Sequence, residues 1–414
     1  MILTAAGSDV LETQAEERPR REPLLRPPSL QTGETRSASR LELFFDLAYV
    51  LVVAELATAF VSDLSWRGAG VFAGLFTVIW FSWVGFTLYA NRFDTDDVVF
   101  RIIKLTATLA IAGCAASATE ATDSLGWAFA ASFLAARLML VLLYLRAWLH
   151  VKQARGTITV YLAAAALSAA LWAASIAVSG TLRYLLWAVA VLTDVAAPVL
   201  ATHNKNDVPL HLEHLPERFG LLVILVLGEM VGAMVIGVHD MKWSSDAVGI
   251  AVIGFLIAAA LWWNYFDVGA ASSAEDLQER ERDQTQAPTE SSAEEVGERH
   301  DLFIYGHLPL TLGIAAAGVG LEDLVLHTDT TLPTAGSWTL VIGVGTFFAG
   351  AAVIVAGADH RWRTAWPWPA SAVPLVAGLG LIPGISAAGA VATIATVTIA
   401  MAIAGTRARR TSTR

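Results

Sequence analysis

The sequence predicts an all-α, polytopic membrane protein with about 12 transmembrane helices, and three observations support this fold class. The 414 residues are 55% hydrophobic and only 15% charged, whereas soluble proteins carry about 25% charged residues. Apolar runs of roughly 20 residues, the length that crosses a bilayer as a helix, recur along the whole chain. These runs are rich in Ala, Leu and Val and do not alternate in polarity, which favours helices over a membrane barrel.

Each predicted span is bounded by polar or turn-forming residues. The final two spans allow two interpretations, because Pro374 and Pro383 either kink the eleventh helix or make it one arm of a re-entrant pair. The predicted spans are residues 41–62, 71–90, 102–119, 126–148, 158–179, 183–201, 219–238, 246–267, 302–321, 337–357, 368–384 and 387–405.

The distribution of Lys and Arg predicts the orientation. Alternate loops and both terminal segments together contain 23 of the 27 cations. The opposite side has only Arg67, Arg183 and Lys242, and Arg137 lies within a span. Because cationic loops stay in the cytoplasm, both termini are predicted to be cytoplasmic, which requires an even number of spans.

Outside the spans, composition indicates solvated segments. Residues 1–40 are polar and have no apolar core of a signal peptide, so we expect a disordered cytoplasmic tail. Residues 269–300 form an acidic cytoplasmic loop, interpreted as a linker with a regulatory element as the alternative. Residues 406–414 form a basic cytoplasmic tail. The spans divide into a first half, 41–205, and a second half, 206–405.

Two pairs of motifs recur six helices apart. Glu42–Phe44 at the start of the first span resembles Glu217–Phe219 before the seventh, and Asn91–Asp94 after the second span resembles Asn264–Asp267 at the end of the eighth. This similarity indicates a parallel 6+6 repeat, as in several carrier folds. Chance similarity between apolar helices is the alternative interpretation.

Ionisable and amide side chains gather near one end of the spans. Because charged groups within a membrane are costly, they indicate a polar cavity that faces the cytoplasm. The structural alternative is that the arginines only extend toward the interface and that helix-end acids pair with them. The candidates for substrate or ion binding are Glu42, Asp46, Asn91, Arg92, Asp94, Arg137, Asp194, Glu217, Arg218, Glu229, Asn264, Asp267 and His307.

Arg137 lies near the middle of the membrane and needs a carboxylate partner. Glu229 or Glu55 is the expected partner, and Arg137 with Glu229 is predicted to be the deepest pair of the cavity. The paired tryptophans Trp80/Trp83 and Trp262/Trp263 are interpreted as interfacial anchors or packing residues.

No metal or cofactor is expected. His211 and His214 flank Glu213 at a spacing that would share a helix face, which makes them weak metal candidates. Pro209 and Pro216 bound this stretch, however, and a polar loop before the next span is the preferred interpretation. Cys114 is the single cysteine, which excludes an intrachain disulfide and a cysteine-based cluster.

With these residues identified, the chain resembles the bacterial low temperature requirement A family. The match covers residues 40–320, about two thirds of the chain, and is less distinct over the last three spans. The resemblance implies a multi-pass protein of the bacterial inner membrane, without implying a substrate or reaction. The matching elements are Glu42–Leu47, Asn91–Asp94, His214–Gly220, Leu227–Glu229, Trp262–Asp267 and Tyr305–Pro309.

Three functions remain open from the sequence. A secondary transporter or ion-coupled permease is favoured, with the lipid bilayer, a proton, a cation or a small solute as partners and no role for nucleic acid. In that function, Asp46, Asp194 and Glu229 would bind the coupling ion. The alternatives are an intramembrane enzyme at the cytoplasmic leaflet and a non-catalytic sensor or scaffold. An ATP-driven pump is disfavoured because no Walker A motif is present.

Overall fold

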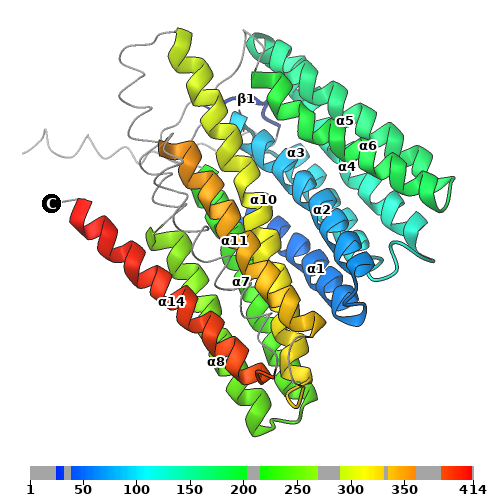
Figure 1. Ribbon diagram of the computed structural model, residues 1–414. Helices are drawn as coiled ribbons and strands as arrows, with labels where there is room; N and C mark the ends of the chain where they lie inside the picture. Colours follow the sequence, from blue (N-terminus) through cyan, green and yellow to red (C-terminus); the bar gives the residue numbers. More distant parts are fainter. Residues whose placement is uncertain are drawn as a thin grey trace, which may run out of the picture.

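The structure is a bundle of long helices (Figure 1), which confirms the predicted fold class. Within the described part of the chain, 11 helices are long and apolar enough to cross a membrane. The predicted span 368–384 lies almost wholly outside that part, so the expectation of a twelfth helix stays a prediction, as does the cytoplasmic location of the termini. The computed structural model describes residues 25–31, 39–202, 215–268, 290–330, 334–359 and 384–412.

Three helices of the predicted first half, α1, α2 and α3, begin at side-chain caps where polar residues precede the apolar runs. Ser39, Ser65 and Asp97 each accept a hydrogen bond from a backbone N–H of the first turn. The cap at Asp97 explains why the third helix starts before the predicted residue 102. The elements are α1 (Arg40–Ser62), α2 (Trp66–Arg92), α3 (Val98–Ala115), α4 (Gly126–His150), the 3-10 turn η1 (Lys152–Ala154), α5 (Arg155–Ile176) and α6 (Thr181–Thr202).

The second half contains one helix that is much longer than expected. This helix, α10, begins at Glu290 rather than at residue 302, and it continues through Pro309. The end of the predicted acidic loop is therefore helical. The elements are α7 (Leu215–Asp240), α8 (Ser245–Trp263), the π-helical turn η2 (Asn264–Val268), α10 (Glu290–Leu326), α11 (Ala335–Asp359) and α14 (Ala387–Ser412).

The helices form two outer groups around a central one. In Figure 1, α4, α5 and α6 lie on one side of the bundle, α8 and α14 lie on the other, and the remaining helices lie between them. The apolar windows of α2 and α10 are the most buried, at 72% and 67%. These two helices are therefore covered mainly by other helices of the bundle.

Helices α10 and α11 approach one another through matched glycines. A Cβ atom on Gly313 would lie 2.4 Å from the backbone nitrogen of Phe347 and 2.5 Å from the carbonyl oxygen of Gly343, so only glycine fits. Small residues of this kind let transmembrane backbones come into direct contact. The glycines repeat at intervals of seven along each helix and pair in antiparallel order, as Gly306 with Gly350, Gly313 with Gly343 and Gly320 with Gly336.

The predicted 6+6 repeat stays a prediction. At an interval of six spans, α1, α2, α3 and α4 would correspond to α7, α8, α10 and α11, and these two sets make similar contacts. Helix α1 contacts α2 and α3, and α7 contacts α8 and α10. Helix α3 packs on α4, and α10 packs on α11. A basic side chain also lies on a phenylalanine ring in each half: Lys104 lies 3.5 Å from the ring centroid of Phe45, and the ring of His307 lies 4.6 Å from that of Phe219.

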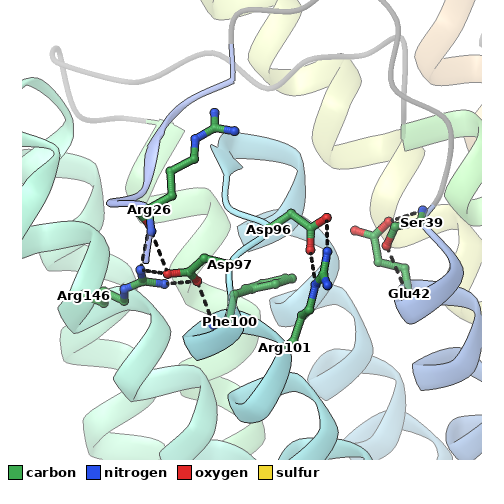
Figure 2. Close-up of polar contacts among 8 residues, drawn as sticks. All are labelled: Arg26, Ser39, Glu42, Asp96, Asp97, Phe100, Arg101 and Arg146. Atoms are coloured by element: carbon green, nitrogen blue, oxygen red, sulfur yellow. Dashed lines mark hydrogen bonds and ion pairs between the residues drawn. The ribbon is translucent and has the colours of Figure 1, made fainter. Parts of the chain in front are cut away.

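The only described strands are two short ones, which attach residues 25–31, here called the N-terminal strap, to the bundle. Strand β1 (Ser29–Leu30) pairs antiparallel with β2 (Phe93–Asp94) in the connection between α2 and α3. In Figure 2, the backbone of Arg26 lies beside Asp97 and Arg146. The strap therefore connects the predicted cytoplasmic ends of α2, α3 and α4.

Candidate functional site

A buried ion pair between Asp46 and Arg218 lies where α1 meets α7. The Oδ1 atom of Asp46 accepts hydrogen bonds from Arg218 Nη2 at 3.0 Å and from Trp83 Nε1 at 2.9 Å. Asp46 has no exposed surface, and the Arg218 side chain is 8% exposed. Two sequence candidates from different halves of the chain are thus brought together, whereas Trp83, interpreted as an anchor, belongs to the site.

Two further charged groups surround this pair. Glu42 lies one turn before Asp46 on α1, and its Oε2 atom is 3.9 Å from Arg218 Nη1. The same carboxylate accepts a hydrogen bond from the backbone N–H of Ser39, which completes a capping box at the start of α1 (Figure 2). Lys104 of α3 is buried and interacts electrostatically with both carboxylates. We call these residues, with Trp83, the α1–α7 cluster.

Not every polar atom of the α1–α7 cluster is satisfied. Asp46 Oδ2 and the Nε and Nη1 atoms of Arg218 are buried and have no hydrogen-bond partner among the described residues. Buried polar atoms in proteins nearly always have a partner, because an unpaired one costs about 1–3 kcal/mol. The cluster therefore retains hydrogen-bonding capacity for a further group.

The second buried ion pair joins Arg137 of α4 to Asp194 of α6. Ser168 of α5 also donates a hydrogen bond to Asp194, at 3.3 Å. This pair corrects the expectation that Arg137 would meet Glu229 or Glu55. The reason is proximity in the fold, since α4 and α6 both pack against α5 in the outer group of the first half.

Glu229 lies apart from both ion pairs. It is partly buried on α7, and its charged neighbours are the carboxylates Glu55 of α1 and Glu322 of α10. Glu55 itself is exposed. The predicted deepest pair of Arg137 with Glu229 is therefore wrong.

The motif at the end of α2 supports the N-terminal strap. Asn91 and Arg92 are buried there, and the guanidinium of Arg92 lies over the ring of Tyr161, 4.8 Å from its centroid. Asp94 forms an ion pair with Arg26 of the strap. These three candidates are not part of the α1–α7 cluster.

Asp97 anchors the strap through several hydrogen bonds. Arg146 donates to both of its carboxylate oxygens, at 2.9 and 2.5 Å, and the backbone N–H groups of Phe100 and Arg26 donate at 2.9 and 3.1 Å (Figure 2). Burial raises the pKa of Asp97, but these hydrogen bonds outweigh burial and hold the pKa below its ordinary value of 3.8. An exposed ion pair, Arg101 with Asp96, lies beside it.

The remaining candidates hold α8 and its π-helical turn in place. Asn264 donates from its amide nitrogen to the carbonyl oxygen of Ala260 at 2.8 Å and to that of Thr398 at 3.1 Å. His307 is fully buried, with Nε2 2.9 Å from the hydroxyl of Tyr265 and Nδ1 2.7 Å from the carbonyl oxygen of Phe303.

The last candidates are either exposed or outside the described residues. Asp267 and Glu217 are both exposed. The weak metal candidates His211 and His214 lie outside the described residues. Cys114 is buried as a free thiol.

Lys104 is a residue of the site that was not among the sequence candidates. It counted only as a topology-setting cation, although its position within an apolar run was a signal of burial. Its role depends on contacts between α3 and other helices, which hydropathy does not reveal.

The fold and these charge pairs define a class of protein: a polytopic α-helical membrane protein whose buried ion pairs join different transmembrane helices. The model of the bacterial low temperature requirement A (LtrA) family matches residues 37–404, and the chain belongs to this family. An uncharacterized protein of Rhizobium meliloti (strain 1021) is 27% identical over 310 residues, which cover 72% of this chain and 71% of that protein. No solved structure matches the chain.

Proposed function

We propose that this protein is an ion-coupled secondary transporter of the bacterial inner membrane, in which Asp46 and Arg218 form the coupling pair. The observation on which the proposal rests is the incompletely satisfied ion pair between α1 and α7, the first helices of the two predicted halves. Carrier folds built from two halves bind substrate and coupling ion at the interface between them. A helical rather than barrel architecture favours the inner membrane.

The alternative is an ion pair that only stabilises the fold. Burying an ion pair costs desolvation energy that good geometry and full hydrogen bonding must offset. Asp46 uses one of its two oxygens for hydrogen bonds, and two nitrogens of Arg218 have no hydrogen-bond partner among the described residues. An ion pair selected only for stability would be expected to use these atoms. Their availability favours a pair that exchanges partners.

The proposed mechanism is a change of partner at Asp46. When a proton or cation neutralises this carboxylate, the attraction between Asp46 and Arg218 is lost. Trp83 still donates to Asp46, so the carboxyl group stays on the α1–α2 side while Arg218 and α7 become free to move. Lys104 and Glu42 interact electrostatically with this pair, so Glu42 remains as a counter-charge for Arg218 when Asp46 is neutralised. Binding of the ion is thereby linked to movement between the halves.

The enzyme alternative has weaker support. His307 is the described buried residue best suited to acid–base catalysis, yet both of its ring nitrogens take part in hydrogen bonds within the bundle. Its neighbours Phe219 and Phe303 cover the ring with aromatic surface. These contacts favour a packing role over proton transfer to a substrate.

Transport is tested by electrical recording from proteoliposomes adsorbed on a solid support. The vesicles receive concentration jumps of sodium, potassium, protons, inorganic anions, carboxylates, amino acids or sugars. We expect protein-dependent transient currents for at least one of these classes. Asp46→Asn should abolish them, because asparagine keeps the oxygen acceptor but removes the charge. Asp96→Asn, which alters an exposed carboxylate at the same end of the bundle, is the matched control.

Two outcomes contradict the proposal. The first is the absence of current for every class of solute. The second is a current that Asp46→Asn leaves unchanged. A scaffold function would instead predict that Asp46→Asn lowers thermal stability without any transport activity to lose.

A further inference from the structure

A small cavity lies beside the Arg137–Asp194 ion pair, inside the first half and away from the α1–α7 cluster. Its volume is about 30 Å³, and α2, α4, α5 and α6 line it. A cavity needs about 10–15 Å³ to hold one water. The space therefore accommodates about two waters or one small monovalent ion. Most of the lining is apolar, and the polar groups that reach it are Arg137, Asp194, Tyr144 and Tyr161.

The unsatisfied polar atoms at this cavity include two donors. Arg137 is 2% exposed, and its Nε atom has no hydrogen-bond partner among the described residues. Tyr144 is 1% exposed, and the same holds for its hydroxyl group. The Asp194 oxygen that meets Arg137 already accepts from that residue and from Ser168. What the cavity lacks is an acceptor, which is the role of a water or an anion.

We propose that this cavity is a binding site for a small inorganic monovalent anion of chloride size, held by Arg137 and Tyr144. The inference goes beyond the proposed transport function, because this site lies apart from the α1–α7 cluster and its test measures anion binding alone. A guanidinium and a phenolic hydroxyl are both strong donors to anions. A metal cation is disfavoured, since it would lie beside the positive charge of Arg137.

Asp194 makes anion binding depend on a proton. While Asp194 is ionised, it neutralises Arg137, and an anion entering the cavity would meet a carboxylate. When Asp194 accepts a proton, the charge of Arg137 becomes available and the anion replaces the carboxylate as its counter-ion. Proton and anion therefore bind together at this site, and the net charge of the cavity does not change.

The other polar and titratable side chains near this site are mostly uncharged. Ser168 of α5 is the further hydrogen-bond partner of Asp194, and Tyr161 adds a phenol from the same helix. From α2 the lining residues are apolar, and the cation at the end of that helix, Arg92, acts on Tyr144 and Tyr161. On the α1 side, Tyr49 interacts electrostatically with Arg137.

The lining residues limit the size of the anion that the cavity can hold. Gly85 lines it, and a Cβ atom at this position would come within 3.0 Å of Leu140 Cδ2 and 3.7 Å of Arg137 Nη1. The cavity is thus closed on this side by a residue without a side chain. Chloride, bromide or nitrate would fit, whereas gluconate would not.

The test measures the thermal unfolding of the full chain in detergent when sodium chloride replaces sodium gluconate at constant ionic strength. For the native protein at pH 5, we expect chloride to raise the unfolding temperature by about 2 °C at saturating concentration, and by less at pH 8. Asp194→Asn resembles the protonated state, so chloride should raise its unfolding temperature equally at both pH values. The double variant Arg137→Gln/Asp194→Asn keeps the site neutral and should show no shift.

Three results would overturn the proposal. A chloride shift that survives in the double variant shows that the anion binds elsewhere. The absence of a shift both in the native protein at pH 5 and in Asp194→Asn shows that the cavity holds no anion. Equal shifts of the native protein at pH 5 and pH 8 contradict the linkage to Asp194.

A milder variant covers the case in which the double variant fails to fold. Tyr144→Phe removes one donor and no charge, so we expect at least a tenfold higher chloride concentration for half of the maximal shift. An unchanged requirement contradicts the assigned role of Tyr144. Because the assay measures binding and not flux, a negative result here leaves the transport recordings with Asp46→Asn to be judged separately.

Discussion

The carboxylate of Asp46 lies 3.0 Å from the guanidinium of Arg218, although 172 positions separate the two residues in the chain. The contact joins α1 to α7, two of the helices that are long and apolar enough to cross a membrane. It places opposite charges on two helices that have few other polar contacts with each other among the described residues. Both stability and function are therefore expected to respond to changes at this pair.

Removing one charge of the pair should destabilise the protein. We expect Arg218→Gln to lower the free energy of unfolding by about 3–5 kcal/mol, because it leaves the Asp46 carboxylate buried without its counter-ion. The double variant Arg218→Gln/Asp46→Asn should be closer to the native protein, since no uncompensated charge remains. Thermal unfolding in detergent measures both effects. A single variant as stable as the native protein would contradict a fully buried pair.

The glycine contacts between α10 and α11 should be intolerant of a methyl group. Gly313→Ala places a Cβ atom against the backbone of α11 and should cost about 1–3 kcal/mol through overpacking. Gly232→Ala is the matched control, because no atom lies within 4 Å of a Cβ atom at that position of α7. The control should be neutral or slightly stabilising, as alanine favours helix. Equal unfolding temperatures for the two variants would show that the helices separate at no cost.

The attachment of the N-terminal strap should depend on pH through Asp97. The lowered pKa of Asp97 in the folded state means that its ionised form contributes stability above pH 3.8, and that this contribution is lost as the pH falls through the folded-state pKa. A dye on Leu25→Cys reports the attachment by fluorescence anisotropy, since residue 25 is exposed and Cys114 is buried. We expect the anisotropy to be constant from pH 8 to pH 5 and to fall below pH 3.8.

The control for the strap removes the anchor at neutral pH. Asp97→Asn should lower the anisotropy already at pH 7, because asparagine cannot bind Arg146 as an ion pair. A variant with the anisotropy of the native protein would show that the strand pairing of β1 with β2 is sufficient without Asp97.

The orientation predicted from the cations is testable with the same cysteine. A membrane-impermeant maleimide added to spheroplasts should label Trp243→Cys, in the connection between α7 and α8, and not Leu25→Cys. Both positions are exposed, with relative exposures of 74% and 67%. Permeabilised cells should label both. The reverse pattern would place the termini outside and contradict the positive-inside prediction.

Features that depend on residues close together in the sequence were predicted more accurately than contacts between distant residues. Helix positions follow from runs of apolar residues, and the start of α1 agrees with prediction to one residue. The start of α3 was placed too late because capping by Asp97 depends on a local hydrogen bond that hydropathy does not detect. The extension of α10 to Glu290 was missed because charged residues there continue a helix beyond the apolar run.

The partner of Arg137 could not be predicted from depth in the membrane. The cost of an unpaired guanidinium correctly required a carboxylate. Asp194 was a candidate for substrate or ion binding, but the partners named for Arg137 were Glu229 and Glu55. Glu229 was favoured because its depth in the membrane is similar to that of Arg137. Every helix crosses that depth, however, so depth alone does not identify the partner. The lateral neighbours of α4 decided the outcome, and these are not encoded by hydropathy.

The sequence by itself determined that lipid is the solvent, where the chain enters and leaves the apolar layer, and which side chains must find polar partners. These properties depend on residue composition along a single helix. The tertiary structure alone decided that Asp46 meets Arg218, that Arg137 meets Asp194, and that matched glycines bring α10 and α11 into contact. Those pairings arise from packing between helices distant in sequence, where shape and charge on both surfaces must agree at once.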